Sequence, residues 1–392
     1  MKWEKRTIND LCEIKGGKRL PKNHELVEFE TNHPYIRARD IGKGIIDFGK
    51  PVYLQENTHN LISRYIVSAN DILLTIVGAN IGDVGLIPKE LEGANLTENA
   101  VKLTLFKNNC HFKYLLYFFL LPGKKQQLEQ FAAGSAQGKL GIYKIKDIEV
   151  SIPPLPNQRK IASILSAYDD LIENNLKRIK LLEEKAFLMY KEIVRNEKLE
   201  IAKLQEVTQV LKRGISPKYV INDGIIVLNQ KCIRHHIVSF EDSRLTDSEH
   251  KPTRERMLQK FDTLINSTGA GTLGRMAMNI QEEISLTVDS HITIARANKN
   301  ITPIFLCHSL FFQEKIIEGM GEGSTNQTEL SARKLGEEIK ISIPSKEIMF
   351  DFEARTEKMF KLVWNLQIQN TKLRTARDIL LPKLMNGQID VS

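Results

Sequence analysis

The sequence is poor in cysteine, in long apolar runs and in targeting signals. Its four cysteines are far apart, at Cys12, Cys110, Cys232 and Cys307, and form no CxxC pair. Such spacing favours neither a zinc site nor a disulfide framework and is typical of a reducing cytoplasm. The longest apolar segment, 114–121, is too short to span a bilayer, and the N-terminus shows no apolar signal-peptide core. We therefore expect a cytoplasmic protein with no membrane association.

Motifs of cofactor-binding and phosphate-binding enzymes are incomplete. Residues 269–274 match the GxGxxG fingerprint, but the following RMAMNIQEE predicts a strand where a bound pyrophosphate needs a helix N-terminus. The corresponding segment 78–82 lacks the middle glycine. A P-loop would need Lys and Ser or Thr where Arg275 and Met276 stand. We interpret both segments as glycine-rich hairpins.

Catalytic clusters are lacking as well. The sequence has no (D/N)PP(Y/F) motif of the kind that adenine methyltransferases use. The nearest approach to the carboxylates of a nuclease is a group that we interpret as the solvated charged face of a helix: Asp169, Asp170, Glu183, Glu184 and Lys185. His235, His236, His291 and His308 do not have the spacing of metal ligands. We therefore expect a non-catalytic protein that binds no metal or cofactor itself.

Length and charge are compatible with two domains and an anionic partner. The chain has 392 residues, which suits two domains of roughly 150–200 residues each. The hydrophobic content of 42% and charged content of 27% fit a soluble globular protein. A net charge of +8 favours nucleic acid or an acidic protein surface as the partner.

The chain contains an internal repeat. DILLTIVGANIGDVGLI at 71–87 aligns with DTLINSTGAGTLGRMAM at 262–278, an offset of 191 residues. Further pairs keep the same order: LTEN at 96–99 with LTVD at 286–289, GSAQGKL at 134–140 with GSTNQTEL at 323–330, and SIPP at 151–154 with SIPS at 342–345. Two tandem copies of about 190 residues predict a pseudo-twofold architecture.

Each copy begins with a mixed globular part. Segments 101–106 and 291–296 alternate like strands, whereas 112–121 and 303–319 have the pattern of helices. We predict an α+β fold with two tandem α/β domains, at 1–155 and 199–346. Long helices are predicted at 156–198 and 347–392.

Both long helices carry a heptad seam. Steps of four and three select Ile161, Leu165, Tyr168, Ile172, Asn175, Ile179, Leu182, Ala186, Met189 and Ile193 in the first helix. The same steps select Phe352, Thr356, Met359, Val363, Leu366, Asn370, Leu373, Arg377, Leu380 and Leu384 in the second. A period of 3.5 over this length is typical of a coiled coil. The alternative is that each helix, about 50 Å long at 1.5 Å per residue, packs on its own domain.

An antiparallel pairing of the two helices gives a testable register. With full overlap, the numbers of facing residues sum to 545, as those of Asn175 and Asn370 do. The polar residues would then meet, which costs stability but fixes register and orientation. Pro382 should kink or end the second helix near its last turn, and Gly387 should stop it.

The order of these features resembles the specificity subunits of type I restriction-modification systems. The DIL hairpin with its glycines, the GSAQGKL loop and the start of the long helix at Ile152, Pro153, Pro154, Leu155, Gln158 and Ile161 carry the resemblance. The closing ILLPKLMNGQID is also similar, with Pro382 as a variant. The second copy departs from the pattern at Ser345 and Met349.

This resemblance implies a division of labour. Each globular domain would recognise one half of a split, asymmetric site in double-stranded DNA. The antiparallel helices would set the number of unread base pairs between the two halves. The helices would also dock two methyltransferase subunits, which bind S-adenosylmethionine. Two restriction subunits that use ATP and magnesium would join them, and this chain would bind no cofactor.

Candidate DNA contacts follow from residue type. For phosphates we select the cations beside glycines in KGGKRL and LKRGISP, namely Lys15, Lys18, Arg19, Lys212 and Arg213. For base edges we select Arg37, Arg39, Asn229, Gln230 and Lys231, because Arg suits guanine and Asn or Gln suits adenine. The two GS loops add Gln137, Lys139, Asn326 and Gln327. Ordinary charged turns are the alternative.

Two other functions remain open from the residues. The same duplicated build would serve a DNA-binding protein outside any modification complex, which gene neighbourhood would distinguish. A methyltransferase or cofactor enzyme could use the loop at 269–274, and this chain alone would then bind S-adenosylmethionine or a dinucleotide. A coiled-coil scaffold would leave the two globular domains unexplained.

Overall fold

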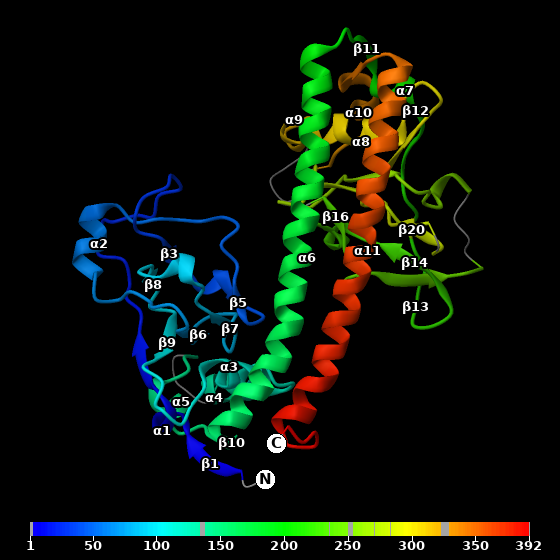
Figure 1. Ribbon diagram of the computed structural model, residues 1–392. Coiled ribbons are helices and arrows are strands. Elements are labelled where there is room, and N and C mark those ends of the chain that lie inside the picture. The colour runs from blue at the N-terminus through cyan, green and yellow to red at the C-terminus, as the bar shows by residue number, and fades with distance from the viewer. Residues whose placement is uncertain are drawn as a thin grey trace. The chain divides into compact units, whose positions relative to one another are not determined.

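The chain folds into two compact units that each contain one globular part and a section of both long helices (Figure 1). The computed structural model describes residues 3–133, 138–234, 236–249, 254–269, 271–282, 284–322 and 329–391. Unit 1 comprises Met1–Glu173 with Thr371–Ser392, and unit 2 comprises Asn174–Asn370. No described helix is long and apolar enough to cross a membrane.

Unit 1 is built on a four-stranded antiparallel sheet in the order β2-β9-β6-β7. The strands of the first copy are β1 (Glu4–Thr7), β2 (Glu13–Gly16), β3 (Tyr35–Ile36), β4 (Ile41–Gly42), β5 (Ile45–Ile46), β6 (Ile72–Thr75), β7 (Val84–Leu86), β8 (Asn95–Leu96), β9 (Ala100–Thr104) and β10 (Glu149–Ile152). Its helices are α1 (Ile8–Leu11), α2 (Glu56–Ile62), α3 (Phe112–Phe119), α4 (Lys124–Ala133), α5 (Ile142–Lys146) and α6 (Leu155–Asn196). Apolar side chains of α3 form the core beneath this sheet together with those of β6 and β9.

Unit 2 repeats that sheet in the order β12-β21-β18-β19. The strands of the second copy are β11 (Glu200–Lys203), β12 (Thr208–Arg213), β13 (Tyr219–Val220), β14 (Gly224–Leu228), β15 (Ile233–Arg234), β16 (Ile237–Val238), β17 (Arg244–Asp247), β18 (Thr263–Asn266), β19 (Met276–Met278), β20 (Leu286–Val288), β21 (Ile292–Ala297) and β22 (Lys340–Ile343). Its helices are α7 (Leu204–Val207), α8 (Pro303–Phe312), α9 (Glu314–Glu318), α10 (Ala332–Glu338) and α11 (Lys346–Met385). The predicted repeat is therefore confirmed at the level of topology.

The predicted glycine hairpins and strands are also confirmed. β6 pairs antiparallel with β7, and β18 with β19, across turns in which Gly78, Gly82, Gly269 and Gly274 have positive φ. The strand β19 follows Gly274, where a dinucleotide loop would start a helix. The predicted helix at 303–319 is interrupted at Gln313 and divides into α8 and α9.

Each sheet buries one carboxylate that a neighbouring strand neutralises. Asp71 pairs with Lys102 at 3.3 Å in unit 1. In unit 2, Asp262 accepts two hydrogen bonds from the guanidinium of Arg296, at 2.8 and 2.7 Å. The two aspartates occupy the repeated position, but the cations stand at different positions of β9 and β21. Because a buried charge is costly unless it is paired, these contacts are part of each core.

The long helices pair antiparallel in the predicted register. In unit 2, Asn175 Nδ2 donates to Asn370 Oδ1 at 2.9 Å. In unit 1, Arg377 Nη1 donates to Asp169 Oδ1 at 2.6 Å, one position from the same register. All twenty seam positions predicted from the heptad pattern are buried or half-buried. The apolar ones among them include Ile161, Leu165, Ile172, Ile179, Leu182, Met359, Val363, Leu366, Leu373 and Leu380. Both helices also contribute side chains to the globular cores. Each helix therefore packs on a globular part and pairs with the other helix.

The end of α11 follows the sequence prediction. The helix continues past Pro382 for less than one further turn and ends at Met385. Gly387 then has φ of +75°, and its N–H donates to the carbonyl of Leu384 at 3.3 Å. The indole of Trp3 lies against Gly387, where a Cβ would come within 3.0 Å of it. Glycine is therefore required at this stop.

The predicted solvated face is wrong at two carboxylates. Asp169 accepts hydrogen bonds from Tyr117 Oη at 2.5 Å and from Arg377. Glu183 is half-buried against the globular part of unit 2, and burial raises its pKa to about 7. Asp170, Glu184 and Lys185 are exposed, as predicted. The error arises because heptad spacing marks the helix–helix seam only, whereas a second face of each helix is covered by a globular part.

Glu183 makes unit 2 sensitive to pH. Because the pKa is raised from its ordinary value of 4.5, the free energy of unfolding should fall as pH rises from about 4.5 to about 7. The other titratable side chains around it are Lys180, Glu184, His236 and His308. We expect Glu183→Gln to be about 1–2 kcal/mol more stable than wild type at pH 8, with little difference at pH 4.5. Urea unfolding at both pH values tests this, with exposed Glu184→Gln as the control; a gap between wild type and Glu183→Gln that does not change with pH would contradict it.

Candidate DNA interface

A glycine in each copy fixes the course of the predicted phosphate loop. The N–H of Gly17 donates to the carbonyl of Ala100 at 3.1 Å, and that of Lys18 donates to the carbonyl of Leu96 at 2.9 Å. Gly214 and Ile215 make the same two contacts in the second copy, with Ile292 and Val288. A Cβ on either glycine would lie 2.0 Å from a backbone carbonyl oxygen. The loops therefore run close against the turn that precedes β9 or β21.

The cations of the first loop lie on its exposed side. Lys15 pairs with Glu13 at 2.9 Å, and Arg19 with Glu98 at 3.0 Å. The Arg19 side chain is nonetheless 84% exposed. Lys18 is exposed, with its ammonium 5.6 Å from the ring centre of Tyr65. Exposed ion pairs of this kind contribute little to stability and exchange readily for a phosphate.

The second loop has fewer cations than the sequence alignment suggested. Strand pairing makes Lys212 the counterpart of Lys15, and Arg213 the counterpart of Gly16. Ile215 and Ser216 then occupy the places of Lys18 and Arg19. Lys212 pairs with Glu255 at 2.6 Å, and the half-buried Arg213 pairs with Glu329 and donates to the carbonyl of Leu330 at 2.9 Å. These contacts favour a structural role for Arg213.

The base-reading candidates fall on a short 3₁₀ turn that both copies share. Arg37 precedes η1 (Ala38–Asp40), and Asn229 precedes η3 (Gln230–Cys232). The Arg37 guanidinium donates to Asp40 at 2.8 and 2.9 Å and to the carbonyl of Lys50 at 2.6 Å. Asn229 accepts from the N–H of Lys231 at 2.9 Å and donates to the carbonyl of Asp242 at 2.5 Å. Both side chains hold the turn in place, which favours a positioning role for them.

The exposed members of these turns are Arg39 and Lys231. They occupy equivalent places, the second position of η1 and of η3. The Arg39 side chain is 67% exposed, against 16% for Arg37. Lys231 is exposed as well. These two cations are therefore the candidates best placed to reach a nucleic acid.

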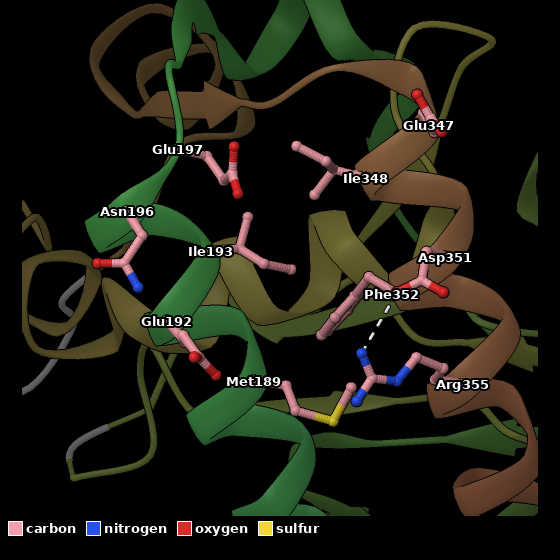
Figure 2. A pocket seen from close by; sticks show the side chains of 10 residues that line it. All are labelled: Met189, Glu192, Ile193, Asn196, Glu197, Glu347, Ile348, Asp351, Phe352 and Arg355. Carbon is pink, nitrogen blue, oxygen red and sulfur yellow. Dashed lines mark hydrogen bonds and ion pairs between the residues drawn. The ribbon is translucent and has the colours of Figure 1, made fainter.

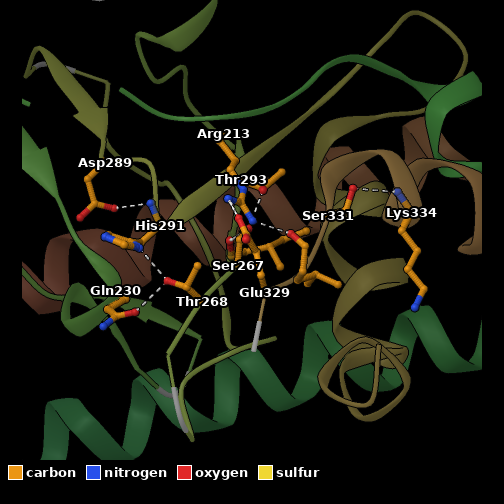
Figure 3. Close-up of polar contacts among 12 residues, drawn as sticks. Arg213, Gln230, Ser267, Thr268, Asp289, His291, Thr293, Glu329, Ser331 and Lys334 are labelled. Carbon is orange, nitrogen blue, oxygen red and sulfur yellow. Dashed lines mark hydrogen bonds and ion pairs between the residues drawn. The ribbon is translucent and has the colours of Figure 1, made fainter. Parts of the chain in front are cut away.

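In the second copy Gln230 belongs to a polar network with Thr268, His291 and Asp289 (Figure 3). Thr268 Oγ1 donates to Gln230 Oε1 at 3.3 Å and lies 2.7 Å from His291 Nδ1. The backbone N–H of His291 donates to Asp289 Oδ1 at 2.9 Å. Burial raises the pKa of Asp289 above the ordinary range of a carboxyl group, although that bond and the nearby imidazole oppose the rise. The network links the 3₁₀ turn to Thr268, which lies in the turn between β18 and β19.

Each GS loop is described at its C-terminal end, where it pairs with the glycine hairpin. Lys139 forms a backbone bridge with Val77, and Glu329 forms the equivalent bridge with Thr268. A cation in one copy thus corresponds to an anion in the other. The predicted contacts Gln137, Asn326 and Gln327 lie outside the described residues. Both described ends of these loops reach the glycine hairpin.

Sequence reasoning missed Thr268, Asp289 and His291. The imidazole of His291 was considered only as a metal ligand, whereas it hydrogen-bonds a threonine next to a base-reading candidate. The repeat alignment did not show this position, because it pairs Asn99 with Asp289. In the structure, Ile76 donates its N–H to the carbonyl of Asn99 and Ser267 donates its N–H to that of His291, both at 2.8 Å. Asn99 and His291 are therefore equivalent positions with different side chains. Within the described residues, no three His, Cys, Asp or Glu side chains gather into a possible metal site.

Comparison with known proteins gives consistent matches. The family model of the type I restriction modification DNA specificity domain matches residues 1–184. The type I restriction enzyme MjaIX specificity subunit of Methanocaldococcus jannaschii is 24% identical over 422 aligned residues, covering 99% of this chain and 94% of that protein. The MjaVIII specificity subunit of the same organism is 24% identical over 421, covering 99% and 93%.

A solved structure shares the fold. The S subunit of a type I restriction-modification system from M. genitalium matches with a TM-score of 0.58 and 19% identity. The match covers 100% of this chain and 97% of that one. The likeness therefore includes both globular parts and both long helices.

Proposed function

Because the chain belongs to the family of type I restriction-modification specificity subunits, we propose that it recognises a DNA site of two different halves separated by unread base pairs. The chain is the recognition component and not the catalyst. One observation carries the proposal: the two copies share a backbone frame but differ in side chains at equivalent exposed or half-buried positions. Arg39 corresponds to Lys231, Asn99 to His291, and Lys139 to Glu329.

The shared frame and the varied side chains suit different tasks. Backbone and cation contacts to phosphates set the position of a reader without reading sequence. Polar side chains on the 3₁₀ turn, the hairpin and the GS loop would then read base edges in a groove. Since the second copy substitutes Lys for Arg and Glu for Lys, the two halves of the site should differ, and no palindrome is needed.

The paired helices provide the surface for partner subunits in this proposal. Five large apolar side chains on α6 are exposed, and four of them are spaced by seven or ten residues: Ile164, Leu171, Leu181 and Leu188. Steps of seven and ten residues put them on one face, as a partner helix requires. Two methyltransferase subunits with S-adenosylmethionine would dock along this face, and two restriction subunits with ATP and magnesium would complete the complex.

A groove in unit 2 offers a second contact for a partner. It has a volume of about 440 Å³ and lies between the C-terminal end of α6 and the N-terminal end of α11 (Figure 2). Its floor is apolar, with Met189, Ile193 and Phe352, and carboxylates from both helices surround it. Arg355 neutralises only Asp351, at 3.3 Å. A methyltransferase segment with an apolar anchor and a basic neighbour would match this groove.

Substitution at the equivalent cations should affect one half of the site each. We expect Arg39→Ala to relax sequence preference in one half and Lys231→Ala in the other, each weakening binding about 10- to 100-fold. Selection of bound sequences from a random duplex pool by the assembled methyltransferase complex measures both effects. Lys299→Ala is the control, because this exposed lysine follows the end of β21 opposite to His291. If either variant alters both halves, or neither, the assignment of one reader per copy is wrong.

A further inference from the structure

Unit 2 contains a cavity that none of the proposed DNA contacts lines. Its volume is about 390 Å³, which lies within the range of small-molecule sites in proteins. Side chains of α6, α8 and α11 line it together with the segments 236–240 and 278–281. Aromatic rings supply much of the lining: Phe187, Phe240, Phe311, Phe360 and Trp364.

Two polar groups at this cavity, Glu183 and His308, present hydrogen-bond acceptors. Glu183 lines it and makes no hydrogen bond or ion pair with any described residue. His308 is buried, and its Nδ1 lies 2.8 Å from the carbonyl oxygen of Ile304. Because a carbonyl only accepts, Nδ1 carries the proton and Nε2 is left as an acceptor. Burial lowers the pKa of His308 to about 4, so the ring is neutral at neutral pH.

No described side chain forms an ion pair with Glu183, although the nearby His236 opposes the rise of its pKa. His236 stacks on Phe311, with ring centres 4.1 Å apart, and its Nε2 is 2.8 Å from Glu314 Oε2. Lys180 lines the cavity but is exposed, with its ammonium free to remain in water. A half-buried carboxylate among aromatic rings is costly unless a positive group approaches it. The cavity therefore has a negative end and an apolar body.

We propose that this cavity binds a small amphipathic amine, with its ammonium at Glu183 and its apolar body among the aromatic rings. The ammonium supplies the donor that Glu183 lacks, and the ring faces of Phe and Trp attract a cation as well. None of the apolar lining side chains is exposed. A protein partner would need an exposed contact rim around the opening, so a small molecule fits these observations better. This site is independent of the proposed DNA recognition.

The probe pair is 2-phenylethylamine and its neutral analogue 2-phenylethanol, added to the full chain at pH 8. The chain has two tryptophans, Trp3 and Trp364, so Trp364 fluorescence in a Trp3→Phe background reports occupancy. We expect saturable binding of the amine at least tenfold tighter than that of the alcohol. Glu183→Gln should abolish this preference, whereas Glu184→Gln, which removes the same charge from the exposed neighbour, should change amine affinity less than twofold.

A second variant fills the cavity. Val238→Phe should prevent binding of the amine while the chain keeps its helical circular dichroism and its DNA binding. Equal affinities for amine and alcohol, amine binding unaffected by Glu183→Gln or by Val238→Phe, or no saturable amine binding would each overturn the proposal. Binding of a partner peptide in place of the amine would do the same.

Discussion

Replacement of Gly17 by alanine should destabilise unit 1 by about 3 kcal/mol and abolish recognition of one half of the DNA site. The added Cβ would lie 2.0 Å from the carbonyl oxygen of Thr97 and 2.5 Å from that of Leu96. Neither oxygen can move freely, because Leu96 ends β8 and Thr97 starts the short turn into β9. The loop would lose the hydrogen bonds that the N–H groups of Gly17 and Lys18 donate, and the cations Lys18 and Arg19 would be displaced.

The neighbouring glycine is a matched control. A Cβ on Gly16 would meet no atom within 4 Å, so Gly16→Ala should be neutral or slightly stabilising. Urea unfolding and DNA binding of both variants measure the difference. Gly214→Ala should affect the other half of the site, because its Cβ would lie 2.0 Å from the carbonyl oxygen of Val288. If Gly17→Ala is as stable as Gly16→Ala, the loop does not follow the course described.

Loss of the Arg296 guanidinium should have a comparable effect on unit 2. The side chains of Arg296 and Asp262 are 8% and 1% exposed, and the same guanidinium donates to the carbonyl of Met257 at 2.7 Å. Arg296→Met would leave the Asp262 carboxylate buried and unpaired. We expect a loss of about 3–5 kcal/mol in the free energy of unfolding, because removal of one partner of a buried pair is much more costly than removal of both.

A double variant and an exposed ion pair show whether the loss of stability comes from the unpaired buried charge. Asp262→Asn combined with Arg296→Met should recover part of the loss, since no unpaired charge then remains. Arg333→Met removes an arginine that is also paired with a carboxylate, Glu337, at 2.8 Å, but the Arg333 side chain is 83% exposed. This control should change stability by less than about 1 kcal/mol. Equal effects of Arg296→Met and Arg333→Met in urea unfolding would show that burial of the pair is unimportant.

The features that sequence predicted well are those with a local period or a repeated order. The glycine hairpins, the heptad seam and the meeting of Asn175 with Asn370 follow from spacing alone, and the structure confirms them. The stop at Gly387 is of the same kind, because helix termination depends on neighbouring residues. The spacing of residues along single segments therefore predicted most of the architecture.

The roles of individual polar side chains depended on contacts between distant segments. Arg213 pairs with Glu329, which is 116 residues further along the chain, and no local pattern links them. Glu183 occupies a polar position of the heptad pattern, yet the segment that begins at His236 covers it. Arg37 is different, since its partner Asp40 is only three residues away. The burial of this pair still depends on the segment around Lys50, whose carbonyl accepts a hydrogen bond from Arg37. These assignments required the folded chain.

The most direct test of two-part recognition is the pattern of DNA methylation in cells that carry this gene together with its methyltransferase subunit. Sequencing of modified bases should show one split motif with N6-methyladenine in both halves, and deletion of this gene should remove it. Arg39→Ala and Lys231→Ala should each degrade a different half of that motif. A single continuous motif, or methylation that persists without this gene, would contradict the proposal that this chain selects the site with two different readers.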